Sequence, residues 1–128
     1  MGLTEKQIQV AVNWWAKIIQ KPKFDNGDKS EAGIIGMGMA SLLVKEVNQE
    51  QTEKFKIELA QKLRSNERSR YQGLHTDYAP CQMLEEAMLS AGVNIDNAPY
   101  KTNMNFKDDG TVWVSYGYGA EWVELNED

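Results

Sequence analysis

The chain has 128 residues, of which 41% are hydrophobic and 26% are charged, and its formal net charge is −5. This length suits one domain with a real core, and the composition argues against a disordered chain. The acidic balance disfavours direct binding to nucleic acid. The single cysteine excludes an intrachain disulfide and a cysteine-based zinc cluster within one chain.

A first helix is predicted from Thr4, which forms a capping box with Gln7, to a stop at Pro22. Its apolar residues recur at helical spacing, and polar residues at Gln9, Asn13 and Lys17 interrupt them. The stretch is therefore neither a signal peptide nor a membrane span. Together with the lone cysteine, this predicts a cytoplasmic protein without a membrane partner.

The second helix, "EAGIIGMGMASLL" at residues 31–43, is unusual because it contains three glycines. Asp28 with Glu31 is predicted to cap its start. Gly36 and Ala40 lie four residues apart, which favours close helix–helix packing through small side chains. A phosphate-binding glycine loop is disfavoured, because no strand precedes the glycines and no Lys-Ser/Thr pair follows them.

Two further helices follow, and the fourth is predicted to begin with Asp77 as its N-cap and to end at Gly92. After Pro99 the pattern alternates like a strand, turns at 107–110 with Asp109-Gly110, and returns from Thr111 to Tyr118. A short third strand is predicted at 122–125. The fold class is therefore α+β. About four helices (4–92) precede a C-terminal antiparallel hairpin or three-stranded sheet (99–126), in one domain of residues 1–128.

The stretch "SYGYGAEWVE" at residues 115–124 alternates tyrosine with glycine. If Tyr116 and Tyr118 point away from the helices, the glycines let a helix approach the sheet. If the tyrosines belong to the core, the glycine face is open to a partner backbone or a flat ligand. The density of aromatic residues favours a recognition surface, since tyrosine and tryptophan are common at interfaces.

Catalytic chemistry finds weak support. Cys81 and His75 offer the elements of a nucleophilic dyad, but Cys81 also belongs to the apolar stripe of the fourth helix. A metal site from His75, Asp77 and Cys81 has no recognised spacing. We therefore predict a protein that is not an enzyme, with no catalytic residue, no metal and no cofactor.

Four stretches carry a resemblance: "HTDYAP" (75–80), "LEEAMLSAGV" (84–93), "APYKTNM" (98–104) and "VWVSYGYGA" (112–120). Over about residues 75–120 the chain resembles small uncharacterised proteins encoded by bacteriophages and prophages. The resemblance implies a phage accessory role in the host cytoplasm and supplies no catalytic residue. It directs attention to the polar residues Asp77, Tyr78, Lys101 and Thr102, and to Tyr118.

The resulting hypothesis is a non-enzymatic phage or prophage accessory protein that binds and inhibits a host or defence protein, such as a component of a nucleic-acid-handling complex. Two alternatives stay open: a small-ligand protein of the nucleotide-binding type, and a phage structural or assembly protein whose hairpin pairs between subunits as a homodimer. The candidate binding surface comprises Trp113, Tyr116, Tyr118, Trp122, Lys101, Thr102, Asp77 and Tyr78.

Overall fold

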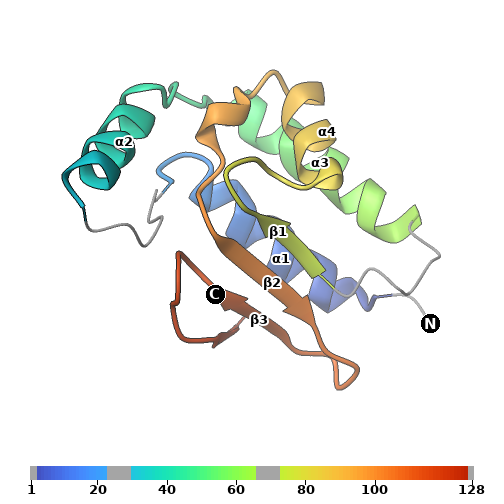
Figure 1. Ribbon diagram of the computed structural model, residues 1–128. Helices are drawn as coiled ribbons and strands as arrows, with labels where there is room; N and C mark the ends of the chain where they lie inside the picture. The colour runs from blue at the N-terminus through green and yellow to red at the C-terminus, as the bar shows by residue number, and fades with distance from the viewer. Residues whose placement is uncertain (1–2, 23–29, 66–72, 127–128) are drawn as a thin grey trace.

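The protein is described by a computed structural model that covers residues 3–22, 30–65 and 73–126. Over these residues it confirms the α+β class, with four α-helices and one four-stranded sheet (Figure 1). The helices are α1 (Glu5–Ile18), α2 (Glu31–Leu42), α3 (Gln49–Ser65) and α4 (Gln82–Ser90). The strands are β1 (Gly73–Thr76), β2 (Thr102–Phe106), β3 (Val112–Ser115) and β4 (Val123–Leu125). None of the helices so described is long and apolar enough to cross a membrane.

The sheet runs in the order β1-β2-β3-β4, and every neighbouring pair is antiparallel. The predicted hairpin is β2–β3, and Gly110 in its turn has a φ of 90°, which suits glycine. The prediction that residues up to 92 are helical was wrong at β1. This strand has only four residues and pairs with residues 102–105, so its partner is distant in sequence and its own alternation is too short to detect.

The core lies between one face of the sheet and the helices. The capping box of Thr4 and Gln7 is confirmed, and α1 buries the predicted stripe against the sheet. Trp15 is 1% exposed and its Nε1 donates to the sulfur of Met104 on β2, at 3.3 Å. In Figure 1, α1 lies behind the sheet, and α3 packs against both α1 and α4.

Helix α2 departs from its prediction. Ser30 accepts a hydrogen bond from the Gly33 amide and caps the helix, whereas Asp28 lies outside the described residues. The predicted close packing through small residues was wrong, because a Cβ added at Gly36 or Gly38 would meet no atom within 4 Å. The helix stands to the side of the sheet and of the other helices (Figure 1).

A buried asparagine connects the end of α1 to the segment after α2. The Asn97 side chain is fully buried, and its Nδ2 donates to the carbonyls of Ile19 (2.9 Å) and Lys45 (2.7 Å). Its Oδ1 accepts from the Lys45 amide at 2.9 Å. Three hydrogen bonds from one side chain therefore fix where the chain leaves α2.

Candidate functional site

The turn after β1 presents two of the predicted site residues. The Thr76–Pro80 bridge and the hydrogen bond from the Cys81 amide to the His75 carbonyl (3.0 Å) fold residues 77–79 outward. The prediction that Asp77 caps the fourth helix was wrong. Cys81 is the N-cap residue of α4 and makes no side-chain capping bond, while Asp77 is held by a different partner.

That partner is Lys101. Its amide donates to the Asp77 carbonyl at 2.9 Å, and its Nζ forms an ion pair with the Asp77 carboxylate. Lys101 has a φ of 53°, a left-handed conformation that few residues other than glycine adopt. This backbone turn directs the ammonium group over the Tyr78 ring, 4.6 Å from its centroid. The hydrogen bond to Asp77 raises the pKa of Lys101, so the ammonium stays charged.

The aromatic ring of Tyr78 is supported from a second side. It meets Tyr100 edge-on, with ring centroids 5.2 Å apart and an interplanar angle of 83°. Tyr78 is nevertheless 59% exposed. It therefore presents a positioned aromatic surface to solvent at low cost in conformational entropy.

Thr102 does not belong to the accessible surface, contrary to the prediction. It is fully buried, and its hydroxyl donates to the Tyr100 carbonyl at 3.1 Å. Its amide donates to the hydroxyl of Thr76 at 3.1 Å. Thr102 thus positions the start of β2 and the neighbouring Lys101 without reaching a ligand itself.

The tyrosine–glycine stretch is a loop over most of its length, because β3 ends at Ser115. The Ser115 hydroxyl donates to the Ala120 carbonyl at 2.7 Å and closes the loop. Gly117 and Gly119 have φ values of 98° and 67°, so glycine is required for the curl rather than for strand packing.

The two tyrosines of this loop serve different surfaces, which corrects their assignment to one strand face. Tyr116 is half-buried and packs edge-on against Trp14 of α1, with centroids 5.4 Å apart. Tyr118 is 57% exposed. Gly119 is exposed, and a Cβ built on it would meet nothing within 4 Å, whereas Gly117 is buried. Neither of the two interpretations therefore holds for the whole stretch, since each placed both tyrosines on one face and both glycines on the other.

A shallow pocket of about 450 Å³ lies where the turn, the start of β2 and the glycine loop meet. Of the predicted surface, Asp77, Lys101 and Tyr118 line it, and Tyr78 packs on Lys101 beside it. The predicted surface did not include the other lining residues, which are His75, Thr76, Asn103, Ser115, Gly117 and Gly119. Among them, His75 was a candidate for a dyad or metal site, and the glycines for a ligand-facing side. His75 and Thr76 lie on β1, and Asn103 pairs with it. Their place in the pocket could not be predicted because the strand itself was not predicted.

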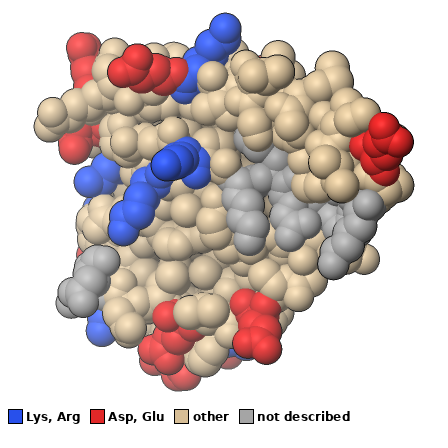
Figure 2. All heavy atoms as spheres, turned by 90° about the vertical axis from the view of Figure 1, so that its left-hand side faces the viewer, with Lys and Arg blue, Asp and Glu red and all other residues tan. Residues whose placement is uncertain are grey.

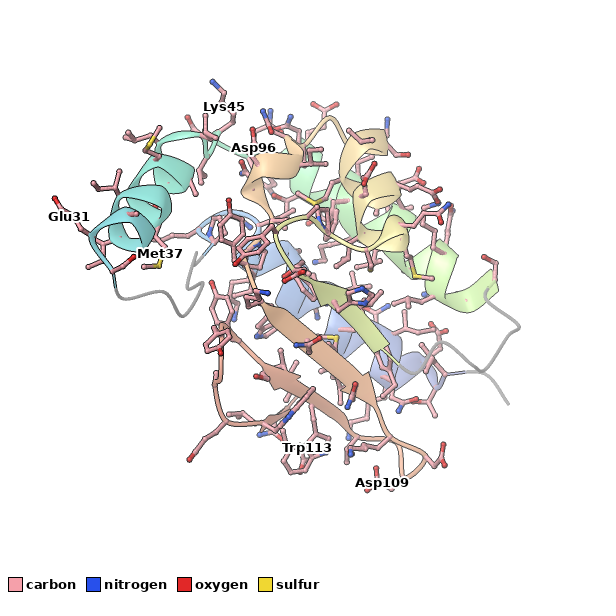
Figure 3. The ribbon with its side chains drawn as sticks, viewed as in Figure 1. Glu31, Met37, Lys45, Asp96, Asp109 and Trp113 are labelled. Carbon is pink, nitrogen blue, oxygen red and sulfur yellow. The ribbon has the colours of Figure 1, made fainter. Side chains whose placement is uncertain are left out.

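The pocket continues onto the outer face of the sheet. Asn105 on β2 is opposite Trp113 on β3, and Trp113 is opposite Glu124 on β4, so these side chains share that face. Trp113 is half-buried, and its Nε1 donates to the Thr111 hydroxyl at 2.9 Å. Figure 3 shows the labelled Trp113 beside β3, away from α2. Trp113 does not line the pocket.

Trp122 lies in the loop just before the edge strand β4 and is 46% exposed. It too stands apart from the residues that line the pocket. The predicted surface therefore divides into a pocket group (Asp77, Tyr78, Lys101 and Tyr118), two separate tryptophans, and two residues turned inward, Thr102 and Tyr116.

The geometry also bears on the nucleophilic dyad. His75 is exposed on the outer face of β1, whereas Cys81 is 8% exposed and belongs to the hydrophobic core. The two side chains lie on opposite sides of the sheet, so the thiol has no imidazole base within this pair. In the described part of the chain, no three His, Cys, Asp or Glu residues gather closely enough to hold a metal ion.

No protein-family model matches the sequence, and a search of curated proteins finds no significant relative.

Proposed function

We propose that the protein is a non-enzymatic binding protein whose partner protein docks on the pocket and the outer face of the sheet. The observation that carries the proposal is the composition of this surface. Tyr78, Tyr118 and Trp113 stand among the serine, asparagine and glycine residues of β2, β3 and the loop. Antibody paratopes use this mixture, because aromatic rings supply contact area at low entropic cost while amides and hydroxyls adapt their hydrogen bonds.

The charge on this surface supports a neutral, aromatic mode of recognition. Lys101 is already paired with Asp77, so the pocket offers no unpaired cation for a phosphate among its lining residues. Its wide opening suits a protruding side chain or loop of a protein better than an enclosed small molecule.

We extend the proposal with the resemblance of residues 75–120 to phage and prophage proteins, since the pocket residues fall within those residues. The partner is then a host or defence protein, and the chain is an accessory protein that inhibits it. The binding test below applies equally to a phage gene and to a bacterial one.

The test is site-specific photo-crosslinking in bacterial cytoplasm. A photoreactive phenylalanine analogue replaces Tyr118, and in a matched control it replaces Leu89 on α4. Both residues are 57% exposed. We expect one discrete crosslinked protein from Tyr118 and none from Leu89. The product should disappear when Tyr78 and Trp113 are also changed to alanine. Identical products from both sites, or none from Tyr118, would refute the docking surface.

The exposed Tyr118 ring in the pocket wall favours a second candidate, a small ligand of the nucleotide type whose base stacks on that ring. Its phosphate would reach Lys101 only by displacing the Asp77 carboxylate from the ion pair. A thermal-shift screen of nucleotides distinguishes it. A ligand at 100 times its dissociation constant adds about 2.7 kcal/mol of stability. Stabilisation that is lost in Tyr118→Ala would favour the ligand, and no shift at millimolar nucleotide would eliminate it.

A further inference from the structure

Helix α2 and its C-cap carry a cluster of exposed large apolar side chains. Five large apolar residues on the helix and its C-cap are each more than half exposed: Ile34, Ile35, Met39, Leu42 and Leu43. A helix that is apolar on every side is normally buried, and a contiguous exposed patch marks an interaction site. In Figure 2, which faces the side where α2 lies, a broad area is free of acidic and basic atoms.

The outward side of α2 follows from helical geometry. Gly33 and Ala40 are the buried residues of this helix, and at about 100° per residue both lie on the opposite side from Gly38. Ile34, Ile35 and Leu42 then surround Gly38 on the outer side. A Cβ built on Gly38 would meet nothing within 4 Å, so nothing in the chain's described part fills this position.

Charge is arranged symmetrically about this glycine. Glu31 lies seven residues before Gly38, and Lys45 lies seven residues after it, just beyond the end of the helix. Within the helix, Glu31, Ile35, Gly38 and Leu42 have the alternating spacing of four and three that forms the seam of a coiled coil. Lys45 follows in the non-helical segment after the C-cap, where hydrogen bonds to the Asn97 side chain hold its backbone. In Figure 3 the labelled Glu31 and Lys45 lie at opposite ends of α2 and point away from the body of the protein.

We propose that α2 pairs antiparallel with α2 of a second copy of this chain, with the two-fold axis beside Gly38. Glu31 of each copy then lies near Lys45 of the other, and Ile35 packs near Leu42 of the other. The small residue stands at the crossing, where the two backbones approach most closely. A parallel arrangement would instead place Glu31 beside Glu31 and Lys45 beside Lys45, so the charges select the antiparallel one.

The expected interface is small. Leu43 lies on another side of the helix from Gly38, so Ile34, Ile35, Met39 and Leu42 of each copy form the contact. They would remove on the order of 800 Å² from water in total, below the usual range for a stable specific interface. The dimer is therefore weak and depends on protein concentration. The dimer contact is separate from the proposed partner site, because none of the residues that line the pocket belongs to α2.

The decisive experiment reverses the end charges in the full-length chain and measures association by sedimentation equilibrium. Glu31→Lys alone and Lys45→Glu alone each replace two attractive pairs with two repulsive ones. Each should raise the dimer dissociation constant by about tenfold. When the two variants are mixed, both opposite-charge pairs are restored, and a heterodimer with wild-type affinity should form. A mixture that associates no better than its components would overturn the antiparallel pairing.

The apolar seam has its own test, with matched controls. Leu42→Glu should abolish the dimer, whereas Ile57→Glu, at a residue 56% exposed on α3, should leave it intact. Circular dichroism checks that each variant is folded. Loss of the dimer in Val123→Glu on β4, but not in Leu42→Glu, would assign the contact to the sheet edge and refute the proposal. A wild-type chain that stays monomeric at high concentration, or that binds phosphatidylcholine vesicles through Leu42 instead, would also refute it.

Discussion

Helices α1 and α2 have similar lengths, 14 and 12 residues, but they differ in how much of their surface is buried. α1 alternates apolar and polar sides and buries seven residues. α2 is apolar around its whole circumference and buries only Gly33 and Ala40. An amphipathic helix defines which side meets the core, whereas a helix apolar on all sides specifies no single side. The contrast teaches that apolar content alone does not place a helix in the core of its own chain.

The largest expected effect of this contrast comes from paired truncations. Trp15→Ala on α1 removes a fully buried ring and its contact with the Met104 sulfur, and should cost about 3–5 kcal/mol of unfolding free energy. Leu42→Ala on α2 removes a side chain that is 83% exposed, and in dilute protein should change stability by about 0.5 kcal/mol or less. Urea denaturation at low concentration measures both. Comparable losses of unfolding free energy in the two variants would show that α2 contributes to the core as much as α1 does.

The second prediction concerns the connection between the two helices. Asn97→Ala leaves the carbonyls of Ile19 and Lys45 and the Lys45 amide without their partner. Because buried unsatisfied groups carry a desolvation penalty, we expect a loss of about 1–3 kcal/mol. Urea denaturation gives the loss, and hydrogen exchange at residues 43–47 should quicken. Asn94→Ala, which removes only a local bond to the Asp96 amide, is the control.

The third prediction compares the two N-caps. Thr4→Ala removes a capping box at a helix that anchors the core, so global stability should fall by about 1 kcal/mol. Ser30→Ala removes the bond to the Gly33 amide at a helix that makes little contact with the rest, so it should chiefly speed hydrogen exchange within α2. Equal losses in global stability would mean that α2 unfolds together with the core.

The smallest effect is a pH dependence at α1. Hydrogen bonds from Arg64 of α3 at 2.8–3.1 Å lower the pKa of Glu5 below its usual value of 4.5. A lowered folded-state pKa means that the pair stabilises the protein above the usual value, and that this contribution disappears as the pH falls through the lowered one. Glu5→Gln should therefore be slightly less stable than wild type at pH 7 and equal to it in acid. A constant difference across pH would contradict the assignment.

The sequence was sufficient where the deciding interaction is local or periodic. The capping box of Thr4 and Gln7, the buried stripe of α1 and the Asp109-Gly110 hairpin depend on neighbours within a few residues, and all three are present. The aromatic density near residues 113–122 was a weaker guide, because of its four aromatic residues only Tyr118 lines the pocket.

Only the tertiary structure decided the rest, because the deciding partners are distant in sequence. Strand β1 exists through its pairing with β2, and that pairing brings His75 beside Asn103. Asp77 does not cap α4, because its carboxylate forms an ion pair with Lys101, which lies 24 positions later in the sequence. The Tyr116 ring points inward because it packs edge-on against Trp14 of α1. The sequence by itself determined the α+β class and the local signals of helices and turns, while long-range contacts decided which side chains share a surface.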